Sequence, residues 1–337
     1  MKTTASLGLL AGLPPLARIR AATVGADGPS HSRPLRVLYS NDATNLTTCD
    51  SPFHKRGEPF GEKMLESAID EVTGLVDAHF LQPGYGWVPW WKSESYPAAE
   101  HYRWYRERYG VKPDGWGRYF LNGGDLAEIF VHRCRLRNQS PFLSLRLNDG
   151  HLKEGVVHGD GKRMQHTVSR FYDENWKRWR VGKTMKNWGD RVLNWAIPEV
   201  RAHKFQFLKE LCAYDIDGLE LDFMRDHTLF RLDETSIAQR EEIITAFVAQ
   251  VRAMMDAEGL KKGRRLKLCV RIPAYLKYHE YIGVNLPKLA AAGVDMAVVS
   301  SSYFTSQRTD FAQMRALAPQ LSLYLEMTHA VSRGARI

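Results

Sequence analysis

The sequence predicts an α/β fold of the (β/α)8 TIM-barrel type, incomplete, with about seven β/α units present. Short apolar segments with strand character alternate with segments that carry a helical apolar stripe. No glycine-rich phosphate turn follows any of these strands, which disfavours a doubly wound nucleotide-binding sheet. The segment from Ile216 to Asp226, IDGLELDFMRD, adds a strand with acids on one face and apolar side chains on the other.

The predicted elements follow one another in the order that a barrel requires. The strands cover Arg36 to Asp42, Asp77 to Gln82, Pro141 to His151, Ile216 to Asp222, Leu266 to Pro273, Val294 to Phe304 and Leu321 to His329. The helices between them cover Glu62 to Leu75, Leu126 to Arg137, Glu199 to Tyr214, Thr235 to Glu258, Val284 to Ala292 and Asp310 to Leu317. A closed barrel needs eight strands, so we expect either a chain truncated before the eighth, which we favour, or a barrel open between its first and seventh strands.

Local signals justify the individual elements. The first helix has its apolar stripe at Met64, Leu65, Ala68, Ile69 and Val72. The second begins after Gly124-Asp125, and Pro198 stands where the first turn of the next helix tolerates proline. Two long insertions rich in aromatic residues follow the second and third strands.

Composition limits the classes of protein that are compatible with this chain. Its 337 residues are 44% hydrophobic and 25% charged, which is ordinary for a globular domain with a substantial core. The net charge of +9 is spread along the chain and no nucleic-acid motif is present, so we expect no nucleic-acid partner. We also expect no membrane span, and the four cysteines lack metal-type spacing.

Residues 1–32 are expected to lie outside the barrel. The segment MKTTASLGLLAGLPPLARIRAA combines a positive charge, a modest apolar stretch and a small-residue cleavage zone. It resembles the second half of a twin-arginine signal, although the arginine pair is absent. The alternative is a disordered tail. We therefore expect an export signal or tail at 1–32, a barrel at 33–337, and a periplasmic or extracellular location.

Polar side chains recur where the predicted strands end, and the active site of a TIM barrel lies at those ends. We expect the following residues to converge there: Asn41, Asp42, His79, Gln82, Arg146, Asn148, Asp149, Glu220, Asp222, Arg225, Arg271 and Glu326. The acids among them suit glycoside hydrolysis, which needs one carboxyl group as acid and another as nucleophile or base. Asp222 is the expected acid/base and Glu326 the expected nucleophile or base, with Glu220 tuning Asp222. Glu326 could instead be a charge tied to Arg271.

Aromatic and basic residues near these ends each have two interpretations. Trp87, Trp90 and Trp91 either stack on sugar rings or form the core of their own insertion. Trp176, Trp179 and Trp188 are expected to be packing residues, since Lys and Arg surround them. The arginines Arg146, Arg225 and Arg271 either bind uronate or sulfate groups or neutralise the acids, with the structural role favoured. An anionic glycan is therefore an open alternative.

Three segments carry a resemblance to a known family. YDIDGLELDFMR, WAIPEVRAHK and YSNDATN are similar to the bacterial family-10-like glycosyl hydrolase proteins, over roughly residues 35 to 331. That resemblance implies an exported barrel enzyme in which Asp222 and Glu326 match the acids closing strands four and seven. True family 10 xylanases end strand four in Asn-Glu, whereas this strand ends in Asp-Phe-Met-Arg.

A second resemblance concerns the fourth strand alone. Chitinase-like family 18 enzymes carry D-G-x-D-x-D-x-E there, and DGLELDFM matches it at Asp217, Glu220 and Asp222. Met224 stands in the position of the essential acid, which argues against chitin cleavage of that type.

The sequence thus predicts a glycoside hydrolase that acts on a poly- or oligosaccharide and needs no cofactor. Two alternatives remain, a non-catalytic carbohydrate-binding barrel and a metal-dependent hydrolase on the same fold. For the latter, His79, His151 and Asp149 are among the possible ligands, but no His-x-His or H-E-x-x-H motif is present. The oligomeric state is not predicted.

Overall fold

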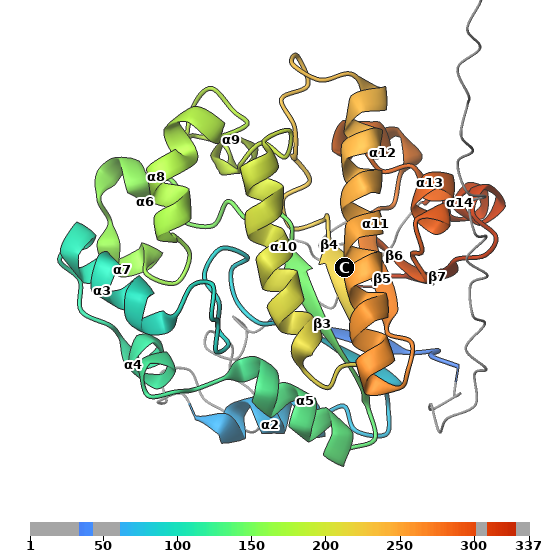
Figure 1. Ribbon diagram of the computed structural model, residues 1–337, viewed down its shortest axis with the longest axis horizontal. Helices are drawn as coiled ribbons and strands as arrows, with labels where there is room; N and C mark the ends of the chain where they lie inside the picture. Colours follow the sequence, from blue (N-terminus) through green and yellow to red (C-terminus); the bar gives the residue numbers. More distant parts are fainter. Residues whose placement is uncertain (1–33, 43–60, 301–308, 328–337) are drawn as a thin grey trace, which may run out of the picture. The chain divides into compact units, whose positions relative to one another are not determined.

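A computed structural model describes residues 34–42, 61–300 and 309–327, all within the unit Arg33–Ile337. Seven parallel strands form one sheet in the order β1 to β7. The sheet curls into an incomplete (β/α) barrel with helices on its outer side (Figure 1). The predicted fold class is confirmed. The predicted export signal, residues 1–32, lies outside the described residues.

The strands occupy the predicted positions but are shorter. They are β1 (Leu38–Asp42), β2 (Ala78–Gln82), β3 (Ser140–Arg146), β4 (Gly218–Asp222), β5 (Lys267–Pro273), β6 (Met296–Ser300) and β7 (Ser322–Leu325). The prediction that the third strand extends to His151 is wrong, because Asn148 and Asp149 bond to loops and to Arg146 and leave the ladder. Residues 301–304 and 328–329 of the last two predicted strands lie outside the described ranges.

Helices follow the strands and also fill the insertions. Those between strands are α2 (Glu62–Asp70), α5 (Leu126–Leu136), α10 (Pro198–Ala213), α11 (Ile237–Lys262), α12 (His279–Ile282), α13 (Leu286–Ala291) and α14 (Phe311–Leu317). The first insertion contains α3 (Ala98–Tyr109) and α4 (Gly115–Leu121), and the second contains α6 (Gly155–His158), α7 (Gly161–Met164), α8 (Arg170–Trp179) and α9 (Trp188–Arg191). The local signals act as expected, since Asp125 accepts a bond from the Glu128 N–H at 2.9 Å and Pro198 begins α10.

The alternation of side chains along the strands produces two separate cores. On β4, Leu219, Leu221 and Phe223 pack outward beneath the helices. Inside the barrel, near the amino ends of the strands, a smaller apolar cluster contains Ala78, Phe80, Phe142, Cys269 and Met296. Each large apolar side chain buried in this way contributes roughly 1.5–3 kcal/mol to folding. The inner apolar cluster therefore fills the interior near the amino ends of the strands, and the polar inward residues lie near the carboxyl ends.

The first and last strands approach each other near this inner apolar cluster. The hydroxyl of Tyr324 on β7 donates a hydrogen bond of 2.9 Å to the carbonyl oxygen of Leu35, just before β1. Both residues also pack against the inner apolar cluster. A side-chain contact thus links the two edges of the sheet.

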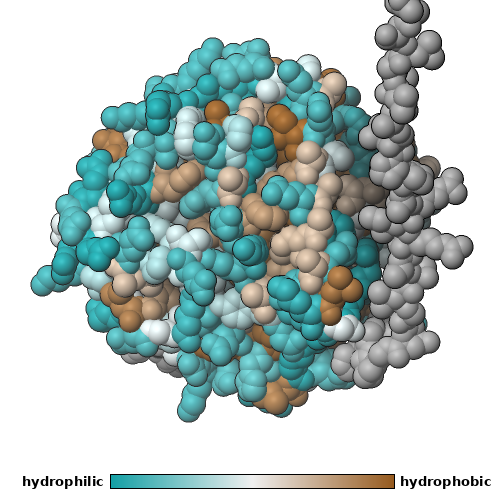
Figure 2. Space-filling model, viewed as in Figure 1, coloured by the Kyte–Doolittle hydropathy of each residue, from teal (hydrophilic) through white to brown (hydrophobic). Residues whose placement is uncertain are grey.

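The face of the protein shown in Figure 2 is mostly hydrophilic. In the view of Figure 2, hydrophilic residues cover most of the described part, and hydrophobic residues lie there in separate small groups. No helix in ranges 61–300 and 309–327 is long and apolar enough to cross a membrane.

Gly218 is expected to be required for the packing of β4 inside the barrel. A methyl group there would lie 2.2 Å from the Phe142 ring and 2.3 Å from the Lys267 carbonyl oxygen. Gly218→Ala should therefore lower the free energy of unfolding by roughly 1–3 kcal/mol. Urea unfolding measures this change. Gly115→Ala is the matched control, since the nearest atom to its methyl group is 3.9 Å away. Equal stabilities of the two variants would contradict the packing argument.

Candidate active site

The inward side chains at the carboxyl ends of the strands form one polar layer across the mouth of the barrel. Register places Arg146 beside Asp222, and Asp222 beside Arg271, on three adjacent strands. Asp42 and Gln82 are register partners on the first two strands. Because alternate side chains share a face, all five belong to the inner side of the sheet.

Arg271 joins the two acids that the sequence predicts to be catalytic. Its Nε and Nη2 atoms donate to the two carboxylate oxygens of Glu326 at 2.8 and 2.7 Å. Its Nη1 atom donates to Oδ2 of Asp222 at 3.4 Å. Burial disfavours the charge of Arg271, but Asp222 and Glu326 outweigh this effect and raise the pKa of the guanidinium. The structure thus brings acids from β4 and the end of β7 to a single cation.

The two acids differ in their surroundings. The Asp222 side chain is 5% exposed, and its Oδ1 atom accepts a bond of 2.7 Å from the backbone N–H of Met224. The Glu326 side chain is 21% exposed, and its backbone N–H donates to the Val299 carbonyl at 2.9 Å, continuing the ladder beyond β7. Both carboxyl groups are therefore held in place by main-chain geometry as well as by Arg271.

Glu220 lies one inward position deeper in the barrel. The Ser144 hydroxyl donates to its Oε1 atom at 2.7 Å, and the Cys269 thiol donates to Oε2 at 3.7 Å. Both donors are its register partners on the neighbouring strands. Burial, reinforced by the charge of Asp222, raises the pKa of Glu220 to about 7. Glu220 therefore retains a proton to nearly neutral pH and adds no third negative charge below the mouth.

A second guanidinium, that of Arg146, organises the other side of the mouth. Its Nη1 atom donates to Asp149 at 2.8 Å, and its Nη2 atom donates to Asp42. Asp149 also accepts bonds from the backbone N–H of His151 at 2.8 Å and from its Nδ1 atom at 2.6 Å. Burial disfavours the Asp149 carboxylate, but His151 and Arg146 outweigh it and hold its pKa well below the ordinary value.

His151 extends this network to the rim. Burial lowers its pKa, so the neutral ring donates from Nδ1 to Asp149 and accepts at Nε2 from Arg225. The rings of Tyr85 and Trp188 lie 5.4 and 4.6 Å from it, centroid to centroid. The loops after β2, β3 and β4 therefore meet at this histidine.

Two predicted site residues lie elsewhere. His79 faces outward on β2, with its Nδ1 atom 3.2 Å from Gln139 Oε1 and its ring 5.1 Å from Phe130. Burial lowers the pKa of His79 to about 4. Asn41 is the register partner of Leu81, which belongs to the outer core. The expectation that both line the mouth is corrected, because strand alternation turns these positions toward the helices.

The tryptophans of the first insertion are packing residues. Trp87, Trp90 and Trp91 are 0%, 3% and 5% exposed. Trp87 stacks on Phe171 with 6.1 Å between ring centroids, and the indole N–H of Trp91 donates to Glu210 at 2.8 Å. Since their ring faces are covered, the expectation that they bind substrate is corrected in favour of the alternative, the insertion's own core.

Two further predicted residues fasten loops. Asn148 donates from Nδ2 to the carbonyl oxygens of Leu193 at 2.8 Å and Thr228 at 3.2 Å. Gln82 donates to the carbonyl oxygen of Gly84 in the turn after β2. Both residues lie near the mouth, and the side-chain N–H groups named here donate to backbone carbonyl oxygens of neighbouring loops.

The residues that match the family 18 pattern lie at both ends of β4. Asp217 precedes the strand at its amino end, where Arg135 donates to it at 2.7 Å. Glu220 and Asp222 point into the barrel, and Met224 is buried beyond its carboxyl end. The first acid of the pattern therefore has a structural role here.

Sequence reasoning missed two ionisable groups that support the mouth. Lys204 on α10 is fully buried and donates to the carbonyl oxygens of Arg146 at 3.0 Å and of Gly86. Burial raises the pKa of Asp226 to about 7, and its carboxyl group accepts a bond of 2.5 Å from the Gly150 N–H. For Lys204 a signal existed, because it interrupts the apolar stripe of its helix.

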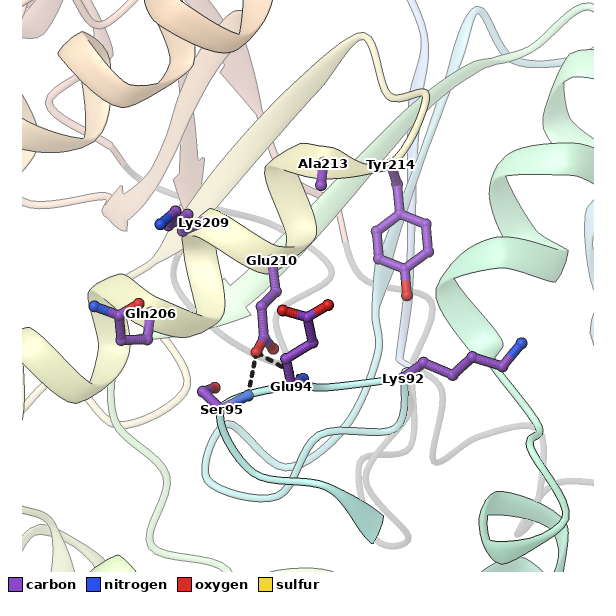
Figure 3. A pocket seen from close by; sticks show the side chains of 8 residues that line it. All are labelled: Lys92, Glu94, Ser95, Gln206, Lys209, Glu210, Ala213 and Tyr214. Carbon is purple, nitrogen blue, oxygen red and sulfur yellow. Dashed lines mark hydrogen bonds between the residues drawn. The ribbon is translucent and has the colours of Figure 1, made fainter.

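A separate hollow of about 570 Å³ lies on the outer surface, beside the second half of α10 (Figure 3). In it, Glu210 accepts bonds from the backbone N–H groups of Glu94 at 3.0 Å and Ser95 at 2.7 Å. The hydroxyl of Tyr214 donates to Asp125 at 2.6 Å. These bonds fasten the first insertion to the helix, on the other side of the sheet from the acids at the mouth.

No protein-family model matches the chain, and no curated protein matches its sequence. Solved structures resemble it distantly. The glycoside hydrolase domain of PelA from Pseudomonas aeruginosa, in a variant form, is 16% identical with a TM-score of 0.39, covering 80% of this chain and 68% of that one. A cycloisomaltooligosaccharide glucanotransferase from Paenibacillus sp. is 11% identical with a TM-score of 0.45, and the match covers 86% of this chain and 38% of that one.

A glycoside hydrolase family 18 N-acetylglucosaminidase from Paenibacillus barengoltzii is 10% identical, with a TM-score of 0.39 and coverage of 87% and 68%. These likenesses concern glycosidases and a related transferase. The chain itself forms an incomplete (β/α) barrel with two acids, Asp222 and Glu326, that share Arg271 at its mouth.

Replacement of Glu220 by Gln is expected to stabilise the protein more at about pH 8 than at about pH 5. The folded pKa of Glu220 is about 7, against an ordinary 4.5. The Glu220 carboxyl group thus binds its proton more tightly in the folded state than in the unfolded state. The resulting stabilisation of the parent protein is complete below the pKa of the unfolded state and is lost as the pH rises through the pKa of the folded state. The difference amounts to up to about 3 kcal/mol.

Urea unfolding of parent and Glu220→Gln across this pH range measures the effect. Glu128→Gln, at an exposed position of α5, serves as the control. A pH-independent difference between parent and Glu220→Gln would contradict a buried, protonated Glu220.

Loss of the Arg271 guanidinium is expected to remove the cation that Asp222 and Glu326 share at the mouth. Arg271→Met should therefore lower the free energy of unfolding by about 3 kcal/mol. Because the penalty comes from uncompensated carboxylates, adding Glu326→Gln should restore part of it. Denaturant unfolding of the single and double variants checks this. A double variant no more stable than Arg271→Met would speak against the bridging role.

Proposed function

We propose that this protein is a glycoside hydrolase that cleaves an oligo- or polysaccharide with the carboxyl groups of Asp222 and Glu326. One observation carries the proposal. Acids from β4 and from the end of β7 converge on the Arg271 guanidinium at the carboxyl end of the barrel. Most glycoside hydrolases use a pair of carboxyl groups that flank the scissile bond.

The surroundings of the two acids support different roles. Glu326 accepts two short bonds from Arg271, which favours its ionised form and suits a nucleophile or base. Asp222 contacts the same cation only at 3.4 Å, through Oδ2. In this proposal Oδ2 of Asp222 gives the proton to the leaving oxygen as the glycosidic bond breaks. If Glu326 is the nucleophile and forms a glycosyl-enzyme, Asp222 then takes a proton from the water that hydrolyses it; if Glu326 is the base, it deprotonates the attacking water directly.

Glu220 supports this chemistry without touching the sugar. Its proton prevents the collection of three negative charges around one guanidinium. Above about pH 7 its ionisation places a like charge near Asp222. In this proposal Glu220 is a positioning and tuning residue.

The pairing of the arginines supports a neutral glycan as substrate over an anionic one. Arg146 bonds to Asp42 and Asp149, and Arg271 bonds to Asp222 and Glu326. Each guanidinium is thus paired with two protein carboxylates, which is the neutralising role considered from the sequence, and the Nε atom of Arg146 makes no hydrogen bond within the described part of the chain.

A non-catalytic carbohydrate-binding barrel is the second candidate, because both acids already have a cationic partner. For a metal-dependent hydrolase, no group of three or more His, Cys, Asp or Glu side chains in the described part of the chain is arranged as a metal site. Metal analysis of the purified protein tests that alternative directly, since a stoichiometric transition metal would favour it.

Asp222→Asn and Glu326→Gln are each expected to reduce glycan cleavage by about 10²-fold or more, because each removes one of the two reacting carboxyl groups. Release of reducing sugar from neutral, uronic and sulfated polysaccharides measures this. Glu128→Gln is the control, an exposed acid on α5 that should leave the rate unchanged. Parental rates in both site variants would exclude the two-carboxylate mechanism, and binding without cleavage by the parent would favour the binding barrel.

A further inference from the structure

We propose that Trp188 is a sugar-stacking platform at the rim of the mouth, on the β3–β4 side, where it binds a hexopyranose ring of the glycan. This inference rests on the proposed function, since it assigns a subsite to the same glycan. It also corrects the expectation that Trp188 is a packing residue.

Trp188 is the exposed tryptophan of this protein. Its exposed fraction is 48%, whereas the other eight tryptophans, all within the described ranges, are buried or half-buried. An indole ring left half in water loses a large part of the free energy that burial would give it. A single exposed aromatic side chain is common on protein surfaces, so it is the position of Trp188 beside the polar rim of the mouth that points to a binding role.

The ring is held by a rigid support. Trp188 begins the short helix α9, and Arg191 at its end is buried, donates to the carbonyl oxygens of Met185 and Lys186 at 3.0 Å each, and pairs with Glu154 at 2.7 Å. The Trp188 backbone also lies against Gly150, where a methyl group would come within 2.9 Å of the Trp188 carbonyl oxygen. The position of the ring is therefore fixed on the loop after β3.

A series of contacts through three side chains links this ring to the strand that neighbours Asp222. The indole meets the His151 ring at 86°, with 4.6 Å between centroids. His151 bonds to Asp149, which bonds to Arg146, the register partner of Asp222. In Figure 1, α9 lies beyond the carboxyl ends of β3 and β4. A sugar chain that reaches Asp222 from this side would pass over Trp188.

The chemistry of the contact suits a neutral pyranose. The Arg191 guanidinium carbon lies 5.5 Å from the centre of the indole ring and occupies one side of it. The His151 ring meets the same indole at 86°. We infer that the exposed part of the ring receives the C–H face of the sugar, whose hydroxyl groups remain in water. Such stacking needs no charge on the glycan, in agreement with arginines that are paired to acids.

The test separates binding from cleavage. Trp188→Ala, Trp188→Tyr and Leu260→Ala are prepared in the full chain, each also combined with Asp222→Asn to prevent turnover. Leu260 is an exposed apolar residue at the far end of α11 and serves as the control. Dissociation constants are measured by affinity electrophoresis with hydroxyethyl cellulose, soluble starch and glycol chitin. For the active forms, KM and kcat are measured on any glycan that is cleaved.

We expect Trp188→Ala to weaken binding roughly three- to tenfold, Trp188→Tyr to retain most of the affinity, and Leu260→Ala to bind as the parent. In the active forms KM should rise more than kcat falls. Parental binding by Trp188→Ala, an equal loss in Leu260→Ala, or no binding of any of the three glycans by the parent would overturn the assignment. A parent that binds but does not cleave would instead refute the hydrolase and leave the role of Trp188 supported by its binding data.

Discussion

The mouth of this barrel depends on guanidinium groups placed between carboxylates from distant strands. Parallel strands end on one side, so acids on β1, β4 and β7 collect negative charge in one place. Two unit charges at 4 Å repel by about 4 kcal/mol at an effective dielectric constant of 20. Arg271 offsets this repulsion for Asp222 and Glu326, and its planar fork fits the bidentate contact with Glu326.

The same principle operates a second time across the mouth, where Arg146 holds Asp42 and Asp149. The acid that lies deepest inside the barrel is kept neutral in another way. Glu220 has no guanidinium among its hydrogen-bond partners, Ser144 and Cys269, and it retains its proton. Negative charge is thus balanced by pairing with arginine at the carboxyl ends of the strands and by protonation deeper inside the barrel.

The insertions serve the site indirectly, through packing. The first insertion buries its tryptophans and fastens to α10 through Glu210, while Lys204 of α10 reaches back to the end of β3. The second insertion places α9 on the loop after β3 and exposes Trp188. The tryptophans of the two insertions therefore differ in their environment. Trp87, Trp90 and Trp91 are buried in a core, whereas Trp188 is exposed to water.

Much of the framework is evident from the amino-acid order alone. Period-two alternation on IDGLELDF assigns Glu220 and Asp222 to the inside and Leu219 and Leu221 to the outside, because successive side chains on a strand point to opposite faces. The same rule would have placed His79 outside, between the inward Ala78 and Phe80. Strand order and helix starts also follow from local signals such as Pro198.

Only the tertiary structure decides which side chains from distant strands contact each other. Arg271 and Glu326 are 55 positions apart, and their contact depends on the curvature of the sheet, which no local pattern encodes. The insertions have no period from which the burial of Trp87 or the exposure of Trp188 could be read. Periodicity specifies the face on which a side chain lies, whereas its partner across the barrel is fixed only when all the strands have packed.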